Sequence, residues 1–344
     1  MTTLADDIEQ MPKVELHVHL EGSVQSQTLL QLAKRNHIAL PADDLEGLRA
    51  WTTFRDFDHF IDVYRAIASC LRSADDIELI AREFLVGQAA QNIVYSEVTF
   101  TPYNQVRSHG LDFHKQIDAV NRARAWGEEA LGVRMGMIVD IPREITPSEG
   151  DRIAGWVIER YGDGVIALGL GGQEIGNPPQ KFRSAFDRVR QAGMPCILHA
   201  GETDGPASVW SALEVAGSRR IGHGVRAIED DALMAHLRDR RIPLEVCPTS
   251  NICLKVFASL SDHSLPQLMA QGLVVTLNSD DPPLFNTTLT REYLIGQSTW
   301  GWTRDTVESL MLNAVDATLL PDIERQEMRH SFKAWFAHSS HAPV

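Results

Sequence analysis

The sequence is poor in cysteine, with four in 344 residues. Only Cys247 and Cys253 lie close together, and their C-x5-C spacing matches neither a zinc ribbon nor a redox motif. We therefore expect reduced, buried thiols and a location in the cytoplasm. The sequence also lacks an apolar run of about 18 residues, which excludes a membrane span. Its start is acidic where a secretory signal is basic and then apolar.

Basic residues are scarce as well, with 32 Lys and Arg against 46 Asp and Glu and a net charge of -14. This balance repels phosphate backbones and anionic lipids, so we expect no nucleic-acid partner and no membrane partner. No stretch rich in Pro, Gly or Ser marks a linker, and repeats are missing. With 44% hydrophobic residues the chain can bury a sizeable core, and we predict a single domain over residues 1–344.

Short β-branched or apolar runs alternate with amphipathic stretches along the chain. From the second run onward, the spacing suits one helix and two loops, which is typical of parallel βαβ units. Eight such units predict an α/β fold of the (β/α)8 barrel type. The predicted strands are Val14–Leu20, Ile93–Phe100, Val133–Asp140, Val165–Gly171, Pro195–Ala200, Arg219–Gly224, Ile242–Pro248 and Leu273–Asp281.

Extra helices are expected after the first strand and at the carboxyl end. The interval Gly22–Asn92 is too long for one crossover, so we predict inserted helices near the barrel mouth, where such barrels build their active sites. The segment Arg304–His338 is also helical by pattern. Within the insertion, Phe54, Phe57 and Phe60 recur every third residue. This stripe suits core packing first, and a lid over the site as the alternative.

Two histidines share one face of the first predicted strand. Because side chains alternate along a strand, His17 and His19 point to the same side together with Glu15 and Glu21. The apolar residues between them point to the other side, as expected for a barrel strand covered by helices. Two imidazoles at this spacing can bind one metal ion, and a hydrogen-bonded pair is the alternative.

Further polar groups follow later strands. His199 ends the fifth strand, and Glu202 comes three residues later, past a glycine that permits a tight turn. A buried carboxyl there can serve as a proton donor, or it can cap a helix starting near Pro206. His223 ends the sixth strand between two glycines, which leaves it room to approach a ligand, although a core histidine is the alternative.

The adjacent carboxylates Asp280 and Asp281 end the eighth strand, where they can cap a helix or divide the work between a cation and a substrate. The polar groups after strands one, five, six and eight all belong to one mouth of a barrel. Three imidazoles and a carboxylate suit zinc, with a position left open for water. Bound zinc lowers the pKa of that water to about 7, which supplies a hydroxide nucleophile.

At this point the sequence resembles the adenosine deaminase branch of the amidohydrolase superfamily, over nearly its whole length. The resemblance implies a (β/α)8 barrel with one zinc ion per chain, a small-molecule purine substrate, and hydrolysis of a 6-aminopurine to the 6-oxo compound with release of ammonia. The matching segments are Met11–Ser23, His199–Thr203, Arg220–Gly224, Leu244–Asn251 and Leu277–Pro282.

The resemblance also implies residue roles. Glu202 would protonate purine N1, and His223 would orient the zinc hydroxide and take its proton. Asp281 would hold N7, and the backbone N–H of Gly172 would meet N3, although a simple turn glycine is the alternative. The implied metal ligands are His17, His19, His199 and Asp280.

One residue departs from the pattern of typical adenosine deaminases, which carry an aspartate contacting the ribose 5′-hydroxyl where this sequence has Glu21. Relatives with this glutamate include enzymes for adenine and for aminodeoxyfutalosine. We expect an adenosine-like nucleoside as substrate, with Glu21 at the mouth and bonded to the sugar. Adenine and aminodeoxyfutalosine are the alternatives.

Other functions are weaker candidates. A binuclear barrel hydrolase for lactones or phosphoesters usually needs a bridging carboxylate or modified lysine after the fourth strand, and no lysine is there. A non-catalytic purine-binding protein would not need the complete set of metal ligands with Glu202 and His223. The zinc cytidine deaminase fold is excluded because the sequence lacks a P-C-x-x-C segment.

Overall fold

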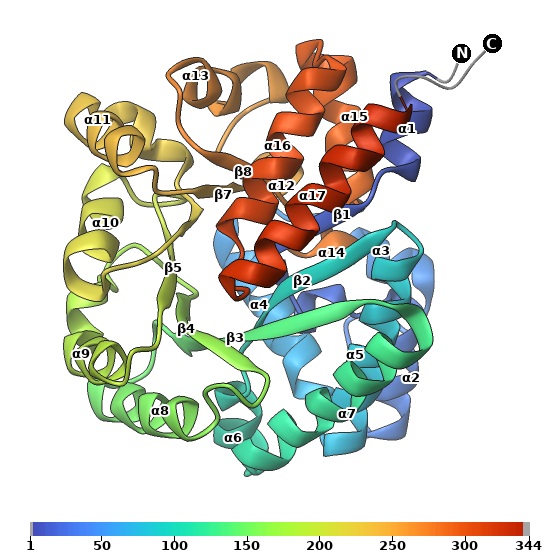
Figure 1. Ribbon diagram of the computed structural model, residues 1–344. Helices are drawn as coiled ribbons and strands as arrows, with labels where there is room; N and C mark the ends of the chain where they lie inside the picture. The colour runs from blue at the N-terminus through green and yellow to red at the C-terminus, as the bar shows by residue number, and fades with distance from the viewer. Residues whose placement is uncertain (1–2, 340–344) are drawn as a thin grey trace.

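The computed structural model describes residues 3–339 and contains one sheet of eight parallel strands in the order β1 to β8 (Figure 1). The last strand meets the first through an isolated bridge between Val18 and Asp280, so the predicted (β/α)8 barrel is confirmed. The strands are β1 (Lys13–His19), β2 (Ile93–Phe100), β3 (Arg134–Pro142), β4 (Val165–Gly171), β5 (Cys196–Ala200), β6 (Ile221–His223), β7 (Leu244–Val246) and β8 (Val275–Leu277).

Helices surround the barrel, with α8 to α11 along the outside of β4 to β7 in Figure 1. The predicted insertion contains α2 to α5, and the carboxyl end contains α16 and α17. The α-helices are α1 (Leu4–Gln10), α2 (Ser26–Arg35), α3 (Leu45–Trp51), α4 (Phe57–Ser69), α5 (Ala74–Ala89), α6 (Tyr103–His109), α7 (Phe113–Leu131), α8 (Pro147–Glu159), α9 (Arg183–Gln191), α10 (Pro206–Ser211), α11 (Asp231–Arg240), α12 (Pro248–Cys253), α13 (Leu265–Ala270), α14 (Pro282–Phe285), α15 (Leu289–Trp300), α16 (Arg304–Ala317) and α17 (Asp322–Ser339).

The last three strands are shorter than predicted. β6, β7 and β8 have three residues each, because the chain turns out of the ladder directly after them. His223 and Asp280 both adopt the left-handed region, with φ of 60° and 65°. Such backbone is costly for a residue with a Cβ and is found where the surrounding structure holds a functional side chain in place.

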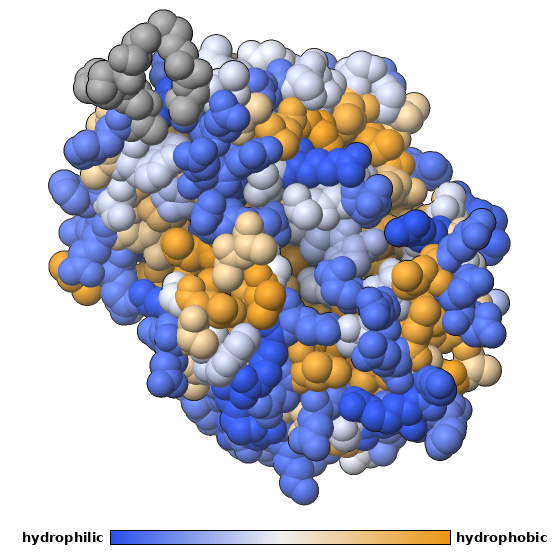
Figure 2. Space-filling model, turned by 90° about the vertical axis from the view of Figure 1, so that its right-hand side faces the viewer, coloured by the Kyte–Doolittle hydropathy of each residue, from blue (hydrophilic) through white to orange (hydrophobic). Residues whose placement is uncertain are grey.

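The core lies mainly between the sheet and the helices. Val14, Leu16 and Val18 of β1 belong to this apolar layer, whereas the inward side chains of β1 are polar, as the alternation predicted. Within residues 3–339, no helix is both long and apolar enough to cross a membrane. Figure 2 shows one face of the molecule, on which hydrophobic patches are broken up by hydrophilic residues.

Candidate active site

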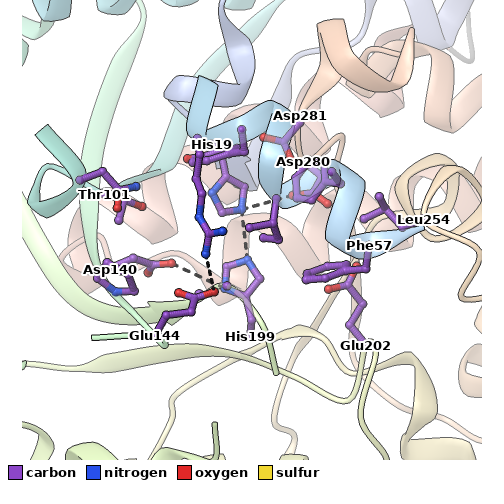
Figure 3. Close-up of a pocket in the computed structure, with 18 of the residues that line it drawn as sticks. His19, Phe57, Thr101, Asp140, Glu144, His199, Glu202, Leu254, Asp280 and Asp281 are labelled. Atoms are coloured by element: carbon purple, nitrogen blue, oxygen red, sulfur yellow. Dashed lines mark hydrogen bonds and ion pairs between the residues drawn. The ribbon is translucent and has the colours of Figure 1, made fainter. Parts of the chain in front are cut away.

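The four predicted metal ligands come together where their strands end. His17 and His19 lie on β1, His199 lies on β5, and Asp280 follows β8. The Nε2 atoms of His19 and His199 are 3.1 Å apart, and Asp280 Oδ1 lies 3.3 Å from His19 Nε2 (Figure 3). One ligand atom from each of the four residues lies within 4.8 Å of the others. The arrangement therefore offers a three-imidazole, one-carboxylate set to a single ion.

The histidine rings are turned so that Nε2 faces the centre of this cluster. His17 Nδ1 lies 2.9 Å from Glu245 Oε2, and His199 Nδ1 lies 3.1 Å from the carbonyl oxygen of Leu170. Each Nδ1–H donates outward, which leaves the Nε2 lone pair for a cation. The buried Nε2 of His17 has no hydrogen-bond partner. A metal ion bound at the centre of the cluster would give this buried atom a partner.

The charge state of His17 supports the same assignment. Burial by itself would lower its pKa, but the Asp280 and Glu245 carboxylates beside its two ring nitrogens raise the pKa to about 10. In the metal-free cluster a proton therefore takes the place of a cation. Metal binding must displace that proton, which makes metal affinity depend on pH.

A second group of four residues overlaps the first and is less suited to an ion. It contains His17 and Asp280 again, together with His223 and Cys247. Burial raises the pKa of the Cys247 thiol well above its ordinary value, and the negative charge of Asp280 adds to this. A thiol that keeps its proton is a poor ligand, because thiolate is the form that binds metal.

A buried ionic network supports His17 from inside the barrel. Glu245, on β7, bonds His17 with one oxygen, and its Oε1 accepts from Arg220 Nε at 2.5 Å. Arg220 also lies 2.6 Å from Glu97 Oε2 on β2. All four side chains are at most 2% exposed. The network connects three strands and holds the His17 ring with Nδ1 toward Glu245.

Glu202 lies in the wall of a cavity that opens beside the metal cluster and contains about 700 Å³ of empty space including its mouth. Burial raises the pKa of Glu202 well above its ordinary value, and the charge of Asp280 raises it further. Its surroundings therefore favour the protonated form of this carboxyl. The alternative role as a helix cap is wrong, because α10 is preceded by Gly205 without a side-chain cap.

Sequence reasoning missed the residue that shapes the Glu202 loop. The Glu174 carboxylate accepts hydrogen bonds from the backbone N–H groups of residues 201, 202, 203 and 204, at 2.5, 3.2, 2.9 and 3.0 Å. Glu174 comes from the loop after β4, two residues beyond Gly172. The only signal in the sequence was its place in the segment Gly169–Glu174, to which no role was given.

His223 belongs to a hydrogen-bond chain that assigns its tautomer. The backbone N–H of Leu265 donates to His263 Nδ1, so the proton of this neutral ring is on Nε2, 3.1 Å from Asn251 Oδ1. The Asn251 amide nitrogen then lies 3.3 Å from His223 Nδ1 and donates to it. Burial lowers the pKa of His223 to about 3, so the ring is neutral with its proton on Nε2.

The protonated Nε2 of His223 faces the reacting groups, 3.7 Å from Glu202 Oε2 and 3.9 Å from Asp280 Oδ2. A nitrogen that already carries a proton can donate a hydrogen bond but cannot take a proton. The arrangement therefore fits the orienting part of the role expected for His223 and not the proton-accepting part.

The neighbouring carboxylates have separate environments. Asp280 accepts from the Ser250 hydroxyl at 2.6 Å and faces the metal cluster, whereas Asp281 lies in the cavity wall with its Oδ1 unpaired. Burial raises the pKa of Asp281 well above its ordinary value, followed by the charge of Asp280. Asp281 occupies the position before α14 without capping it, so the helix-cap alternative does not apply. A Cβ on Gly22 would lie 1.5 Å from Asp281 Oδ1, so only glycine fits there.

Gly172 lines the same cavity with φ of 99°, a backbone conformation that favours glycine. Beside it is Asp140, which the sequence analysis placed at the end of a strand without a role. Asp140 is buried, lines the cavity, and has no partner for Oδ1. Its carboxylate fills the space over two glycines of β4, because a Cβ on Gly169 or Gly171 would lie 1.8 or 2.3 Å from its oxygens.

The structure does not place Glu21 where we expected it. Strand β1 ends at His19, and Glu21 begins a short 3-10 helix, Glu21–Ser23. Its carboxylate is fully buried outside the cavity lining and accepts from the Tyr64 hydroxyl and the Thr101 N–H, both at 3.0 Å. Tyr64 and Thr101 line the cavity instead. The expected bond from Glu21 to a sugar hydroxyl is therefore wrong for this conformation.

The phenylalanine stripe is divided between the cavity wall and the core. Phe57 and Phe60, on α4, line the cavity. Phe54 does not line it and packs against Phe60 and Phe285, with ring centroids 5.4 and 5.7 Å away. The stripe is thus core at its beginning and cavity wall further along, and a role as a lid stays a prediction.

The chain is similar to known proteins over almost its whole length. The family model described as adenosine deaminase matches residues 12–335. The chain is 38% identical over 313 residues to an adenine deaminase of Pseudomonas putida, covering 91% of this chain and 99% of the relative. It is also 38% identical over 315 residues to an aminodeoxyfutalosine deaminase of Streptomyces coelicolor, covering 91% of this chain and 81% of the relative.

A solved amidohydrolase structure from Burkholderia ambifaria with bound zinc superimposes with a TM-score of 0.90 at 26% identity, covering 98% of this chain and 94% of that one. The two curated relatives act on adenine-type compounds by their names, and the family model covers almost the whole chain. The protein is therefore a hydrolytic deaminase of adenine-type substrates, and it belongs to the adenosine deaminase family.

Proposed function

We propose that the protein binds one zinc ion per chain and hydrolyses a 6-aminopurine with an N9 substituent, in the manner of an adenosine-like nucleoside, to the 6-oxopurine and ammonia. The observation that carries this proposal is the meeting of a four-ligand cluster with Glu202, His223 and Asp281 at one cavity. Three imidazoles and a carboxylate are ligands that zinc prefers, and the ring orientations leave their Nε2 lone pairs available.

The metal cluster would consist of His17, His19, His199 and Asp280. When bound there, zinc supplies water activated as a nucleophile at neutral pH. The two candidate groups share His17 and Asp280, so they cannot each complete a separate site. Metal analysis should find one equivalent per chain, and His199→Ala should lose it. Two equivalents would contradict the single-ion proposal.

Glu202 performs the proton transfer in this proposal. Its protonated carboxyl donates to purine N1, which makes C6 electrophilic, and the water oxygen adds to C6. The neutral His223 donates a hydrogen bond from Nε2 and orients that oxygen. One proton of the water passes to the amino group, the bond from C6 to this nitrogen breaks, and ammonia leaves. The second proton of the water restores Glu202.

Asp281 and Gly172 hold the ring. The protonated Asp281 carboxyl can donate to N7, and the N–H of Gly172 can donate to N3. Two donors on opposite edges of the purine fix its rotation, so that C6 faces the reacting groups. Because N9 is on the far side of the bicyclic ring from C6, an N9 substituent points away from the cluster and toward the cavity mouth.

The shape of the cavity favours a substituted purine. Deep residues such as His223 and Asp280 are buried, whereas Arg65 at the mouth has a side chain 57% exposed, so the cavity gives a substituent a path toward solvent. Free adenine is the second candidate. The Tyr64 hydroxyl already donates a hydrogen bond to the Glu21 carboxylate, which would otherwise be available to a sugar hydroxyl.

Ammonia release from adenine and adenosine separates these candidates. We expect kcat/KM for adenosine to exceed that for adenine by more than tenfold, which corresponds to about 1.4 kcal/mol of added binding. A higher kcat/KM for adenine would overturn the choice of a substituted purine. Failure to release ammonia from any 6-aminopurine would overturn the proposed reaction.

A further inference from the structure

The rim of the cavity contains an arginine that the reaction does not use. Arg65 lies on α4 one residue after Tyr64, and its side chain is 57% exposed. Across the mouth, Glu144 follows β3 and is 29% exposed. Figure 3 shows Glu144 with the dashed line that marks the contact between the two residues. The reacting groups lie deeper, so this pair stands where the far end of an N9 substituent would arrive.

The guanidinium of Arg65 forms two loose ion pairs and no hydrogen bond. Its Nη2 is 3.7 Å from Glu144 Oε1, and its Nη1 is 3.8 Å from Asp62 Oδ1. Both distances exceed those of a hydrogen bond. Within residues 3–339 no hydrogen bond joins this side chain to another group. Its planar fork of donors therefore remains available for a ligand in the cavity.

Arg65 is also the only lysine or arginine among the described residues that line this cavity. The same lining contains five acidic side chains, which are Asp140, Glu144, Glu202, Asp280 and Asp281. An anionic substrate would meet acidic groups on its way inward, and only Arg65 can compensate its charge. A neutral substituent would have no need for this guanidinium.

Building on the proposed function, we propose that Arg65 determines specificity for a 6-aminopurine whose N9 substituent ends in an anionic group, a carboxylate or a phosphate. A carboxylate matches one guanidinium in charge and in bidentate geometry, whereas a phosphate monoester carries about -1.5 to -2 and usually needs more cations. The cavity lining also includes Phe57, Ile61 and Leu254, so it offers apolar surface to the uncharged part of a substituent.

Three nucleosides that differ only at the 5′ end test this proposal: adenosine with a hydroxyl, adenosine 5′-carboxylic acid, and adenosine 5′-monophosphate. The readout is the ratio of kcat/KM for each anionic substrate to kcat/KM for adenosine. We expect Arg65→Gln to lower this ratio about tenfold, mainly through KM. Added salt should shrink the difference between the wild type and the variant, because Arg65 is half exposed.

Two further variants provide matched comparisons. Glu144→Gln keeps an oxygen that can accept from the backbone N–H of Gln173, 3.0 Å away, but removes the competing charge beside Arg65. It should therefore raise the anion ratio. Arg55→Gln removes the same charge from an exposed residue just before α4 that does not line the cavity, and it should leave the ratio unchanged.

The outcomes are distinct. If Arg65→Gln lowers the kcat/KM ratio only for adenosine 5′-carboxylic acid, Arg65 recognises a carboxylate. If it lowers the ratio only for adenosine 5′-monophosphate, Arg65 recognises a phosphate. Both support the proposal. Ratios that stay constant in Arg65→Gln, or fall equally in Arg55→Gln, overturn it. If wild-type protein deaminates none of the three nucleosides, the proposed function itself fails, which this assay separates from a failure of Arg65 alone.

Discussion

Replacing Arg220 with methionine tests whether the ionic network inside the barrel stabilises the fold. Arg220 is 1% exposed, and its guanidinium contacts Glu245 at 2.5 Å and Glu97 at 2.6 Å. It also donates to the carbonyl oxygen of Ala317 at 2.8 Å. Methionine approximates the length of the aliphatic part of arginine, so the substitution removes the charge and leaves most of the volume filled.

The expected cost follows from the two carboxylates that remain. Glu97 keeps the Tyr95 hydroxyl at 3.1 Å and the Leu319 N–H at 2.6 Å, and Glu245 keeps His17. Glu97 is left without a cation, whereas Glu245 keeps the protonated His17, whose pKa is about 10. Removing one partner from a buried ion pair costs about 3–5 kcal/mol, and we expect Arg220→Met to fall in this range. Burial would raise the pKa of Glu245, but Arg220 holds it below its ordinary value.

The assay is urea unfolding in the presence of a chelator, so that metal binding adds nothing to the free energy of unfolding. Arg190→Met is the matched control, because Arg190 pairs with Asp187 at the surface with a side chain 44% exposed, and such a pair contributes about 0–1 kcal/mol. In Arg220→Met, burial should raise the pKa of the Glu245 carboxyl, because the charge of Arg220 no longer lowers it. The destabilisation should therefore grow as pH rises and shrink in acid, where the carboxyls bind protons.

This reasoning is refuted if Arg220→Met loses no more unfolding free energy than Arg190→Met does, provided that the two variants have equal m-values. The network would then not contribute to stability beyond a surface pair. A cost independent of pH would locate the loss in packing around residue 220 and not in the uncompensated carboxylates.

Three other predictions concern the site and its surroundings. Glu202→Gln should lower kcat by roughly 10²–10⁴ with metal content unchanged, because an amide cannot deliver a proton, and a third of wild-type turnover would contradict this. Asn251→Asp should lower kcat more than tenfold with metal retained, because a carboxylate draws the His223 proton to Nδ1; unchanged kcat would contradict the assigned tautomer. Burial raises the pKa of Glu292 to about 7, so the folded protein retains a proton that the unfolded chain releases. From about pH 4.5 to pH 8, the unfolding free energy of the wild type relative to Glu292→Gln should therefore fall by up to about 3 kcal/mol, and a constant difference would be inconsistent with that pKa.

The sequence alone predicted the barrel and the convergence of its polar groups. The strands Ile93–Phe100 and Val165–Gly171 have the predicted bounds, and His17 and His19 share a face as the alternation required. These features are local, because a period of two residues defines a strand face and parallel strands place their carboxyl ends at one edge. The short β6 to β8 differ because the residues after them leave the ladder to form the site.

Tertiary structure decided which groups support and surround the predicted residues. Glu245 is 228 positions from His17 in the sequence, and Tyr64 is 43 from Glu21, yet each pair is in hydrogen-bond contact. No local period encodes such pairs, because they depend on how strands and inserted helices pack in space. For the same reason the sequence placed Glu21 beside a sugar, whereas packing of α4 turned its carboxylate toward Tyr64 and Thr101. The residue types defined the chemistry, and the packing defined which of them face the substrate.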